Sequence, residues 1–229
     1  MSGVVENHLP AHVLSVGTFA HAVAQRLKIR RSDVIESTIG RDSVPASPDW
    51  VPSRMILLIA WRAVPSLCEF VNHLSFERDR PFVPVIQDLT VLRVGPIIMP
   101  GLGPCWNCWA TRLQQHAGWT AQREALLDHY ESHPDEGPRG FVEPLVRIAS
   151  SILADRMDAI DTSSVTPGLI WQLDILTGEI TTATLVGVHN CTYCGLRRSP
   201  LERSVSGIRE QLSYLWSSGG DVVYGRERC

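Results

Sequence analysis

Lysine is almost absent from this chain. Only Lys28 of its 21 basic residues is a lysine, and it lies in a Lys-Ile-Arg-Arg stretch that we interpret as a solvent-exposed helix end. Enzymes that hold nucleotide phosphates, form Schiff bases or use an amine as a base commonly need a placed lysine. The phosphate loop Gly-x-x-x-x-Gly-Lys-Ser/Thr is also missing. These two absences argue against lysine-dependent nucleotide or amine chemistry.

The net charge is small, and long hydrophobic runs are absent as well. A formal net charge of -3 over 229 residues gives no electrostatic basis for binding nucleic acid. Apolar runs such as Met55–Ala60 and Val94–Met99 have the length of strands and are too short to cross a bilayer. The N-terminal residues lack the basic and apolar regions of a secretion signal. We therefore expect a cytoplasmic protein that binds neither nucleic acid nor membrane.

Cysteine is rare, yet four of the six cysteines form two pairs of the Cys-x-x-Cys type. The pairs are Cys105 with Cys108 and Cys191 with Cys194. At this spacing two thiolates can reach one metal ion from a tight turn, and two such pairs supply the four ligands of a tetrahedral zinc site. Four thiolates leave no open position for water, so we predict a structural Zn²⁺ that joins two remote stretches of the chain.

Two other interpretations of the pairs stay open. A single Cys-x-x-Cys can be a redox motif, which normally lies at a helix start in a thioredoxin-like unit. Two disulfides would require an oxidising compartment. The turn residues Gly103-Pro104 before the first pair and Gly195 after the second favour metal-binding knuckles over both.

The remaining reactive side chains are given structural interpretations. Cys68 lies within an apolar helical stripe, which favours a small core residue over a nucleophile. His189, two residues before the second pair, is interpreted as part of the knuckle rather than as a ligand. Asp155 and Asp158 fall on the outer face of a predicted helix, where we expect them only to be solvated. No catalytic residue is predicted.

Hydrophobic periodicity predicts an α/β domain with a mostly parallel sheet, because strands and helices alternate along the chain. Strands are expected over residues 12–16, 54–60, 82–86, 89–94 and 97–99, and a hairpin over 169–175 and 179–186. Helices are expected over 20–27, from Pro65 onward, and over 106–115, 142–160 and 208–216. Residues 116–140 are polar and contain a proline–glycine break, so no regular element is predicted there.

The first strand and helix are joined by a turn that resembles a dinucleotide-binding turn with glycines lost. Ser15, Gly17 and Ala20 stand where the Gly-x-Gly-x-x-Gly pattern has three glycines. One glycine permits the turn, but loss of the others weakens the case for a phosphate at the helix N-terminus. We expect no nucleotide there.

Two longer segments resemble the ThiF-like partner proteins of thiazole/oxazole-modified peptide (TOMM) biosynthesis. The first is Val94-Gly95-Pro96-Ile-Ile-Met-Pro100-Gly101-Leu-Gly-Pro104-Cys105-Trp-Asn-Cys108, followed by Arg112-Leu113. The second begins at Asp174-Ile-Leu-Thr-Gly178-Glu-Ile-Thr-Thr and ends in His-Asn-Cys191-Thr-Tyr-Cys194-Gly195. The match is good over residues 82–113 and 168–195 and weaker over 10–80.

The resemblance implies a degenerate ThiF-like, Rossmann-type sheet closed by a four-cysteine zinc site. It implies a non-catalytic subunit that binds the leader of a ribosomal precursor peptide and presents the core to a YcaO-type cyclodehydratase. That enzyme uses ATP to form azolines. The resemblance assigns structural zinc to Cys105, Cys108, Cys191 and Cys194. A homodimer is compatible with such a subunit.

Departures from the family define the alternatives. Longer relatives carry an N-terminal winged-helix module for leader binding, whereas this chain starts almost directly at the first strand, so we expect leader recognition on another surface or protein. We expect the ThiF-like domain over residues 1–198 and a tail over 199–229. The alternatives are an active ATP-dependent adenylating enzyme and a zinc-binding interaction protein outside peptide maturation.

Overall fold

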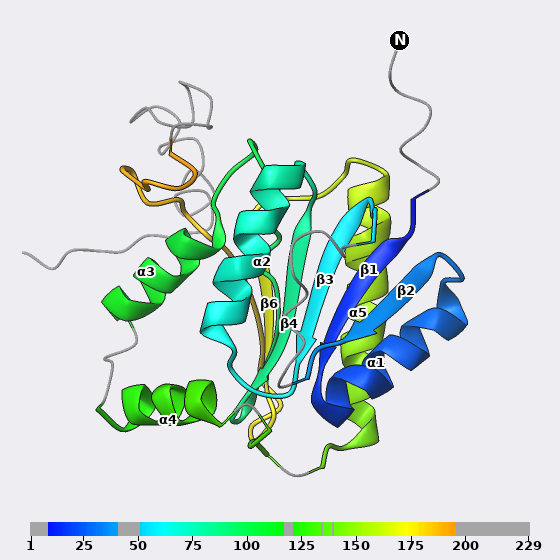
Figure 1. The fold of residues 1–229 in the computed structure, drawn as a ribbon, viewed down its shortest axis with the longest axis vertical. Helices are drawn as coiled ribbons and strands as arrows, with labels where there is room; N and C mark the ends of the chain where they lie inside the picture. The colour runs from blue at the N-terminus through cyan, green and yellow to red at the C-terminus, as the bar shows by residue number, and fades with distance from the viewer. Residues whose placement is uncertain (1–8, 41–50, 117–120, 134, 139, 196–229) are drawn as a thin grey trace, which may run out of the picture.

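The computed structural model describes residues 9–40, 51–116, 121–133, 135–138 and 140–195, and within them seven strands form one sheet in the order β2-β1-β3-β4-β5-β6-β7 (Figure 1). The strands are β1 (Ala11–Val16), β2 (Val34–Thr38), β3 (Met55–Ala60), β4 (Phe82–Asp88), β5 (Val91–Val94), β6 (Leu169–Asp174) and β7 (Ile180–Thr184). The helices are α1 (Gly17–Arg30), α2 (Pro65–Arg78), α3 (Trp106–His116), α4 (Ala121–Ser132) and α5 (Glu143–Asp161).

The sheet is mixed but mostly parallel in direction. Strands β2, β1, β3 and β4 pair in parallel, while β5, β6 and β7 pair antiparallel to their neighbours. Along the chain β1 is followed by β2 and then by β3, and these two strands lie on opposite sides of β1. The crevice between the carboxyl ends of β1 and β3 is therefore the topological switch point, the usual ligand position in open α/β sheets. The predicted α/β class is confirmed.

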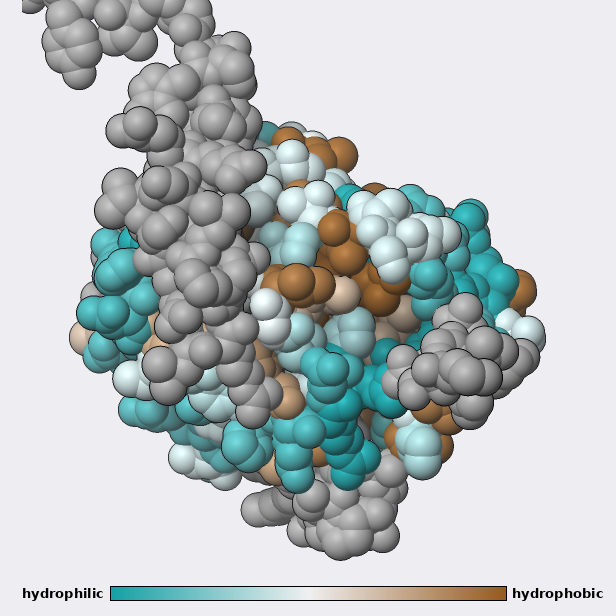
Figure 2. Space-filling model, turned by 90° about the horizontal axis from the view of Figure 1, so that it is seen from above, coloured by the Kyte–Doolittle hydropathy of each residue, from teal (hydrophilic) through white to brown (hydrophobic). Residues whose placement is uncertain are grey.

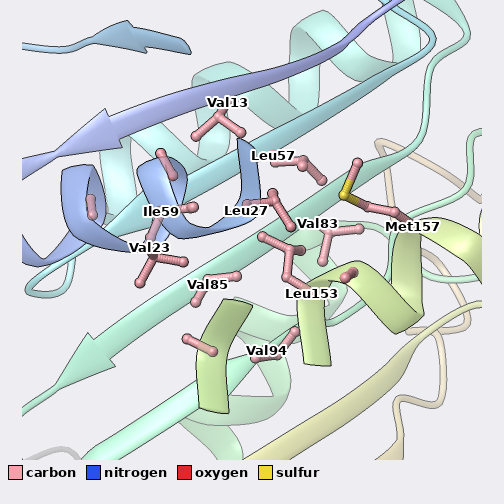
Figure 3. Packing of buried hydrophobic residues seen from close by; sticks show 14 of the residues in the cluster. Val13, Val23, Leu27, Leu57, Ile59, Val83, Val85, Val94, Leu153 and Met157 are labelled. Atoms are coloured by element: carbon pink, nitrogen blue, oxygen red, sulfur yellow. The ribbon is translucent and has the colours of Figure 1, made fainter. Parts of the chain in front are cut away.

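Helices cover both faces of the sheet (Figure 1). Helices α1 and α5 pack together on one face, and α2 and α3 on the other. The central strands β1 and β3 are buried along their whole length, which explains their nearly continuous apolar sequences. Figure 3 shows the α1/α5 side, where Leu27, Leu153 and Met157 meet the strand residues Leu57 and Val83.

Three elements differ from prediction. Strand β2 was not predicted, because only Val34 of this sheet-edge strand is fully buried and its pattern is weak. Helix α4 was not predicted either, since none of its residues, all described, is fully buried. Residues 97–99 form only a single bridge, Phe82 with Ile98, instead of a strand. The expected helix 208–216 and the boundary at residue 198 lie outside the described residues.

The edge of the sheet where the parallel strands begin is seen from above in Figure 2. Several hydrophobic residues show there among hydrophilic ones. In the described part of the chain, every helix is too short or too polar to cross a bilayer.

Candidate metal centre and the closed glycine turn

The two Cys-x-x-Cys pairs meet in space. The Sγ atoms of Cys105 and Cys191 are 3.6 Å apart, those of Cys108 and Cys194 are 3.5 Å apart, and those of Cys105 and Cys108 are 3.9 Å apart. All four Sγ atoms lie within 4.8 Å of one another. Three of the cysteines are buried and Cys191 is half-buried.

The local backbone explains why these sequences bring the thiols together. Helix α3 begins at Trp106, directly after Cys105. The Trp106 N–H donates to Oδ1 of Asn72 on α2. In the second knuckle the Gly195 N–H donates to the Cys191 carbonyl. A Cβ on Gly195 would lie 2.4 Å from that carbonyl oxygen, so the turn requires glycine.

The second knuckle is anchored to helix α2 by an aromatic side chain. The hydroxyl of Tyr193 lies 2.8 Å from Nδ1 of His73, and its ring meets Phe76 edge-on at 5.2 Å. These contacts place Cys191 and Cys194 on the α2/α3 face of the sheet, beside the first knuckle.

Hydrogen bonds prepare one thiol for ionisation. The thiols of Cys105 and Cys194 lower the pKa of the Cys108 thiol, and the N–H of Val188 donates to its Sγ at 3.4 Å. A thiolate is the form that binds metals. The same contacts raise the pKa of the Cys105 thiol, so without a metal ion the cluster favours ionisation of Cys108 and opposes that of Cys105.

The geometry fits a metal ion better than disulfides. Ligand sulfurs at about 2.3 Å from a tetrahedral Zn²⁺ lie about 3.8 Å apart, close to the separations seen here. Sulfurs joined in a disulfide would be about 2.05 Å apart. The four cysteines can therefore hold a metal ion.

Other predicted residues fall outside this centre. His189 is exposed and is not part of the cysteine cluster. Cys68 is buried in the core as predicted, and desolvation by burial raises the pKa of its thiol to about 12, so it is neutral. Asp155 and Asp158 are both exposed, as predicted, and Asp158 also forms an ion pair with Arg31.

The glycine turn is occupied by a tryptophan. Gly17 opens α1 with φ of +85°, and a Cβ placed there would lie 2.5 Å from Cγ and Cδ1 of Trp61. Trp61 follows strand β3 and also lies against Gly137, where a Cβ would be 2.9 Å from its ring. The indole thus covers the turn on which a phosphate would rest in a dinucleotide-binding fold.

The acidic residue about 20 positions after that turn is also engaged. In dinucleotide-binding folds such a residue binds the ribose hydroxyl. Here the Glu36 carboxylate accepts hydrogen bonds from Ser15 (2.8 Å) and Lys28 (2.8 Å), and lies 2.9 Å from Nδ1 of His21. Although its burial raises the pKa of Glu36, these hydrogen bonds hold it below the usual value. Lys28 lies in the last turn of α1, as predicted, and its partly exposed ammonium pairs with Glu36.

A cavity of about 660 Å³ remains at the switch point beside Trp61. Its charged lining residues, within the described chain, are Arg62, Glu131 and Asp135. The Arg62 guanidinium donates to the carbonyls of Ala63 and Tyr130, both at 3.1 Å. Two carboxylates against one engaged guanidinium make an unfavourable environment for a triphosphate.

One histidine pair received no role from the sequence, although its spacing suits metal binding. His129 lies in the last turn of α4 and His133 directly after the helix, and their rings stack at 4.4 Å. Nε2 of His129 is 2.7 Å from Oε2 of Glu136. No third ligand joins them among the described residues, so we assign no metal site here. Trp61 was missed as well, because a tryptophan after a strand carries no distinctive pattern.

No protein-family model and no curated protein matches this sequence. Solved structures do match. The chain is 18% identical to the heterocyclase TruD with a TM-score of 0.58, covering 84% of this chain and 28% of TruD. It is 14% identical to a chain of the E. coli microcin synthetase McbBCD complex with a TM-score of 0.59, covering 83% and 70%. A third match is E. coli MccB in a structure with AMPCPP and MccA, at 14% identity and a TM-score of 0.58, covering 83% and 67%.

These likenesses concern the fold. At such identities they show that the chain folds like heterocyclase and microcin synthetase proteins, as the resemblance in its sequence implied. The chain spans only about a quarter of the length of the heterocyclase chains, 26% in one complex with substrate and cofactor.

Proposed function

We propose that this chain is a non-adenylating, zinc-stabilised subunit that presents a ribosomal precursor peptide to a YcaO-type cyclodehydratase for azoline formation. Residues 1–198 would form its ThiF-like domain. The fold supports this proposal, because solved proteins that share it include a heterocyclase and a microcin synthetase complex.

The observation that carries the non-adenylating role is the indole of Trp61 over Gly17. A nucleotide in this fold places its phosphates on that turn, where the N–H groups of the helix point at them. The indole fills this space, and the Glu36 carboxylate is already held by four side chains. ATP chemistry would then belong to the partner enzyme.

Zinc is the metal that the ligand set favours. Four thiolates in tetrahedral spacing suit Zn²⁺, whereas Mg²⁺ and Ca²⁺ prefer oxygen ligands. Such an ion supplies folding free energy rather than reactivity, since all its positions are filled by the protein. Its role here would be to hold α3 and the segment after β7 together.

The test is reconstitution with the YcaO-type enzyme and precursor peptide encoded nearest to this chain. Mass spectrometry would follow the loss of one water per ring, with and without this chain. We expect cyclisation to require it, and we expect the chain to co-purify with both partners. Complete cyclisation in its absence would refute the proposal.

The alternative is an adenylating enzyme, which the match to a structure of MccB with AMPCPP favours. ATP–pyrophosphate exchange with candidate acids, and calorimetric titration with AMPCPP, distinguish the two. We expect neither exchange nor binding, because Trp61 occupies the turn. Exchange above the level of a heat-denatured sample would favour the alternative.

A further inference from the structure

A second, smaller cavity lies on the α2/α3 face, away from the glycine turn. Its volume is about 130 Å³, and it is lined by residues of helices α2, α3 and α4 and of strands β4 and β5. Trp106 and Trp109, both from the first cysteine knuckle, supply aromatic walls. In Figure 1, α4 stands apart from the two helical layers that flank the sheet. The cavity has room for one compact chemical group.

A buried arginine faces this cavity, and no carboxylate of the described residues forms an ion pair with it. Arg93 is 7% exposed and stands in the middle of the sheet on β5, between Leu92 and Val94, which point to the opposite face. Its guanidinium lies over the ring of Trp109 at 4.7 Å. Among the described residues its side chain makes no hydrogen bond or ion pair, and its Nε is buried without a partner.

Two other arginines of the chain have carboxylate partners. Arg31 and Arg54, both mostly buried, each contact the carboxylates of Asp33 and Asp161. A buried guanidinium without an acceptor costs several kcal/mol, so proteins normally provide one. Carboxylates therefore pair with Arg31 and Arg54, whereas Arg93 faces a cavity.

The charges around the cavity favour a single anion. Asp88 lines it but is held by Arg123, whose Nη2 lies 2.5 Å from Oδ2 of Asp88. The thiol of Cys68 is neutral, because its pKa is raised to about 12. Two guanidinium groups and one carboxylate thus leave one positive charge.

We propose that this cavity binds a carboxylate of a small acid or of an acidic peptide side chain, with the Arg93 guanidinium as its main partner. A carboxylate accepts two parallel hydrogen bonds from a guanidinium and brings one negative charge. Phosphate would bring an excess of charge next to Asp88. The aromatic walls suit the short hydrocarbon part of such a ligand. The inference does not rest on the role proposed above.

The experiment uses the zinc-loaded full chain and two carboxylate probes, propionate and N-acetyl-glutamate amide. Propionamide, which has the shape of propionate without its charge, is the matched control, with phosphate and chloride as competing anions. Calorimetry measures binding, and the Nε–H resonance of Arg93, identified by its loss in Arg93→Met, reports the site. We expect the carboxylates to bind and to shift that resonance, and propionamide to do neither.

Variants then separate a binding role from a structural one. Arg93→Met should weaken carboxylate binding about tenfold or more, because the charged hydrogen bonds are lost. It should leave the melting temperature equal or higher, since a buried unpaired charge is removed. Arg31→Met is the control: it should lower the melting temperature and leave carboxylate binding unchanged.

Several outcomes would overturn the proposal. Equal binding of propionate and propionamide would do so, as would phosphate or chloride binding at least as tightly as the carboxylates. Unchanged binding in Arg93→Met would place the ligand elsewhere. A wild-type chain that binds no carboxylate, together with a lower melting temperature in Arg93→Met, would make Arg93 a structural residue. The two probes also separate the sources: preference for the glutamate derivative indicates a peptide side chain, and preference for propionate a free acid.

Discussion

The two faces of the sheet are built differently. The α1/α5 face buries an almost purely hydrocarbon cluster, including Leu27, Leu153 and Met157. The α2/α3 face buries Asn72, Arg93 and three of the four clustered cysteines. The fourth, Cys191, is half-buried there. Strand β5 illustrates the division, because Leu92 and Val94 point to the first face and Arg93 to the second. The α1/α5 face forms a hydrophobic core, and the α2/α3 face carries the side chains that can bind ligands.

This division has an energetic basis. A dry aliphatic face contributes roughly 25 cal/mol per Å² of apolar surface buried, without any ligand. The other face contains groups that cost free energy unless something pairs with them: thiols that suit a metal and a guanidinium that suits an anion. The stability of the second face should therefore depend on what it binds, and that of the first should not.

The largest expected effect is loss of the metal centre. Cys105→Ser or Cys191→Ser should abolish stable zinc binding and unfold the chain or make it aggregate, because structural zinc sites contribute about 10–16 kcal/mol. Metal analysis by mass spectrometry should give about one zinc per wild-type chain. Cys68→Ala is the matched control, and it should keep the zinc. A folded wild-type protein that never contains metal would contradict the shared site.

A smaller effect is expected from a cavity on the other face. Leu153→Ala removes a fully buried side chain from the α1/α5 cluster and should cost about 2–5 kcal/mol of unfolding free energy. Chemical denaturation measures this loss. Zinc content should stay at the wild-type level below the unfolding transition. If zinc were lost in the native baseline, the two faces would not be independent.

The third prediction concerns the turn between the faces. Gly17→Ala should be destabilising through its positive φ and through the clash with Trp61. Gly101→Ala isolates the first contribution, because Gly101 has φ of +77° but nothing within 4 Å of a Cβ. We expect Gly17→Ala to cost about 1–3 kcal/mol more than Gly101→Ala by urea denaturation. Equal losses would mean that the indole does not close over the turn.

The sequence predicted the aliphatic face better than the chemical one. Helix α5 was found within one residue at each end, because its apolar stripe repeats at helical spacing. The cysteine pairs were identified from their spacing, and the fold brings them together. Arg93 could not be singled out from the sequence, because an arginine in a short strand is common. Only the fold shows that tryptophans and a thiol lie around it. Trp61 and Glu36 depend on contacts between remote segments, which local patterns do not encode.

The smallest effect should come from the polar cluster around Glu36, on the α1 side of the sheet edge. Its side chain is only 5% exposed, and its partners lower the pKa of its carboxyl. A lowered pKa means that the interaction stabilises the fold above the ordinary value of 4.5 and that this stabilisation is lost as the pH falls below it. Glu36→Gln should therefore cost about 1–2 kcal/mol near neutral pH.

Urea denaturation of wild type and Glu36→Gln over a series of pH values measures this, and the difference between them should shrink below pH 4.5. Glu136→Gln is the control: Glu136 also has a lowered pKa and a histidine partner, but its side chain is 60% exposed. Solvent screens such a pair, so its replacement should leave the unfolding transition unchanged. If Glu36→Gln lowered the free energy of unfolding as much in acid as at neutral pH, the charge of the carboxylate would contribute nothing to stability. The polar groups around Glu36 would then stabilise the fold through packing alone.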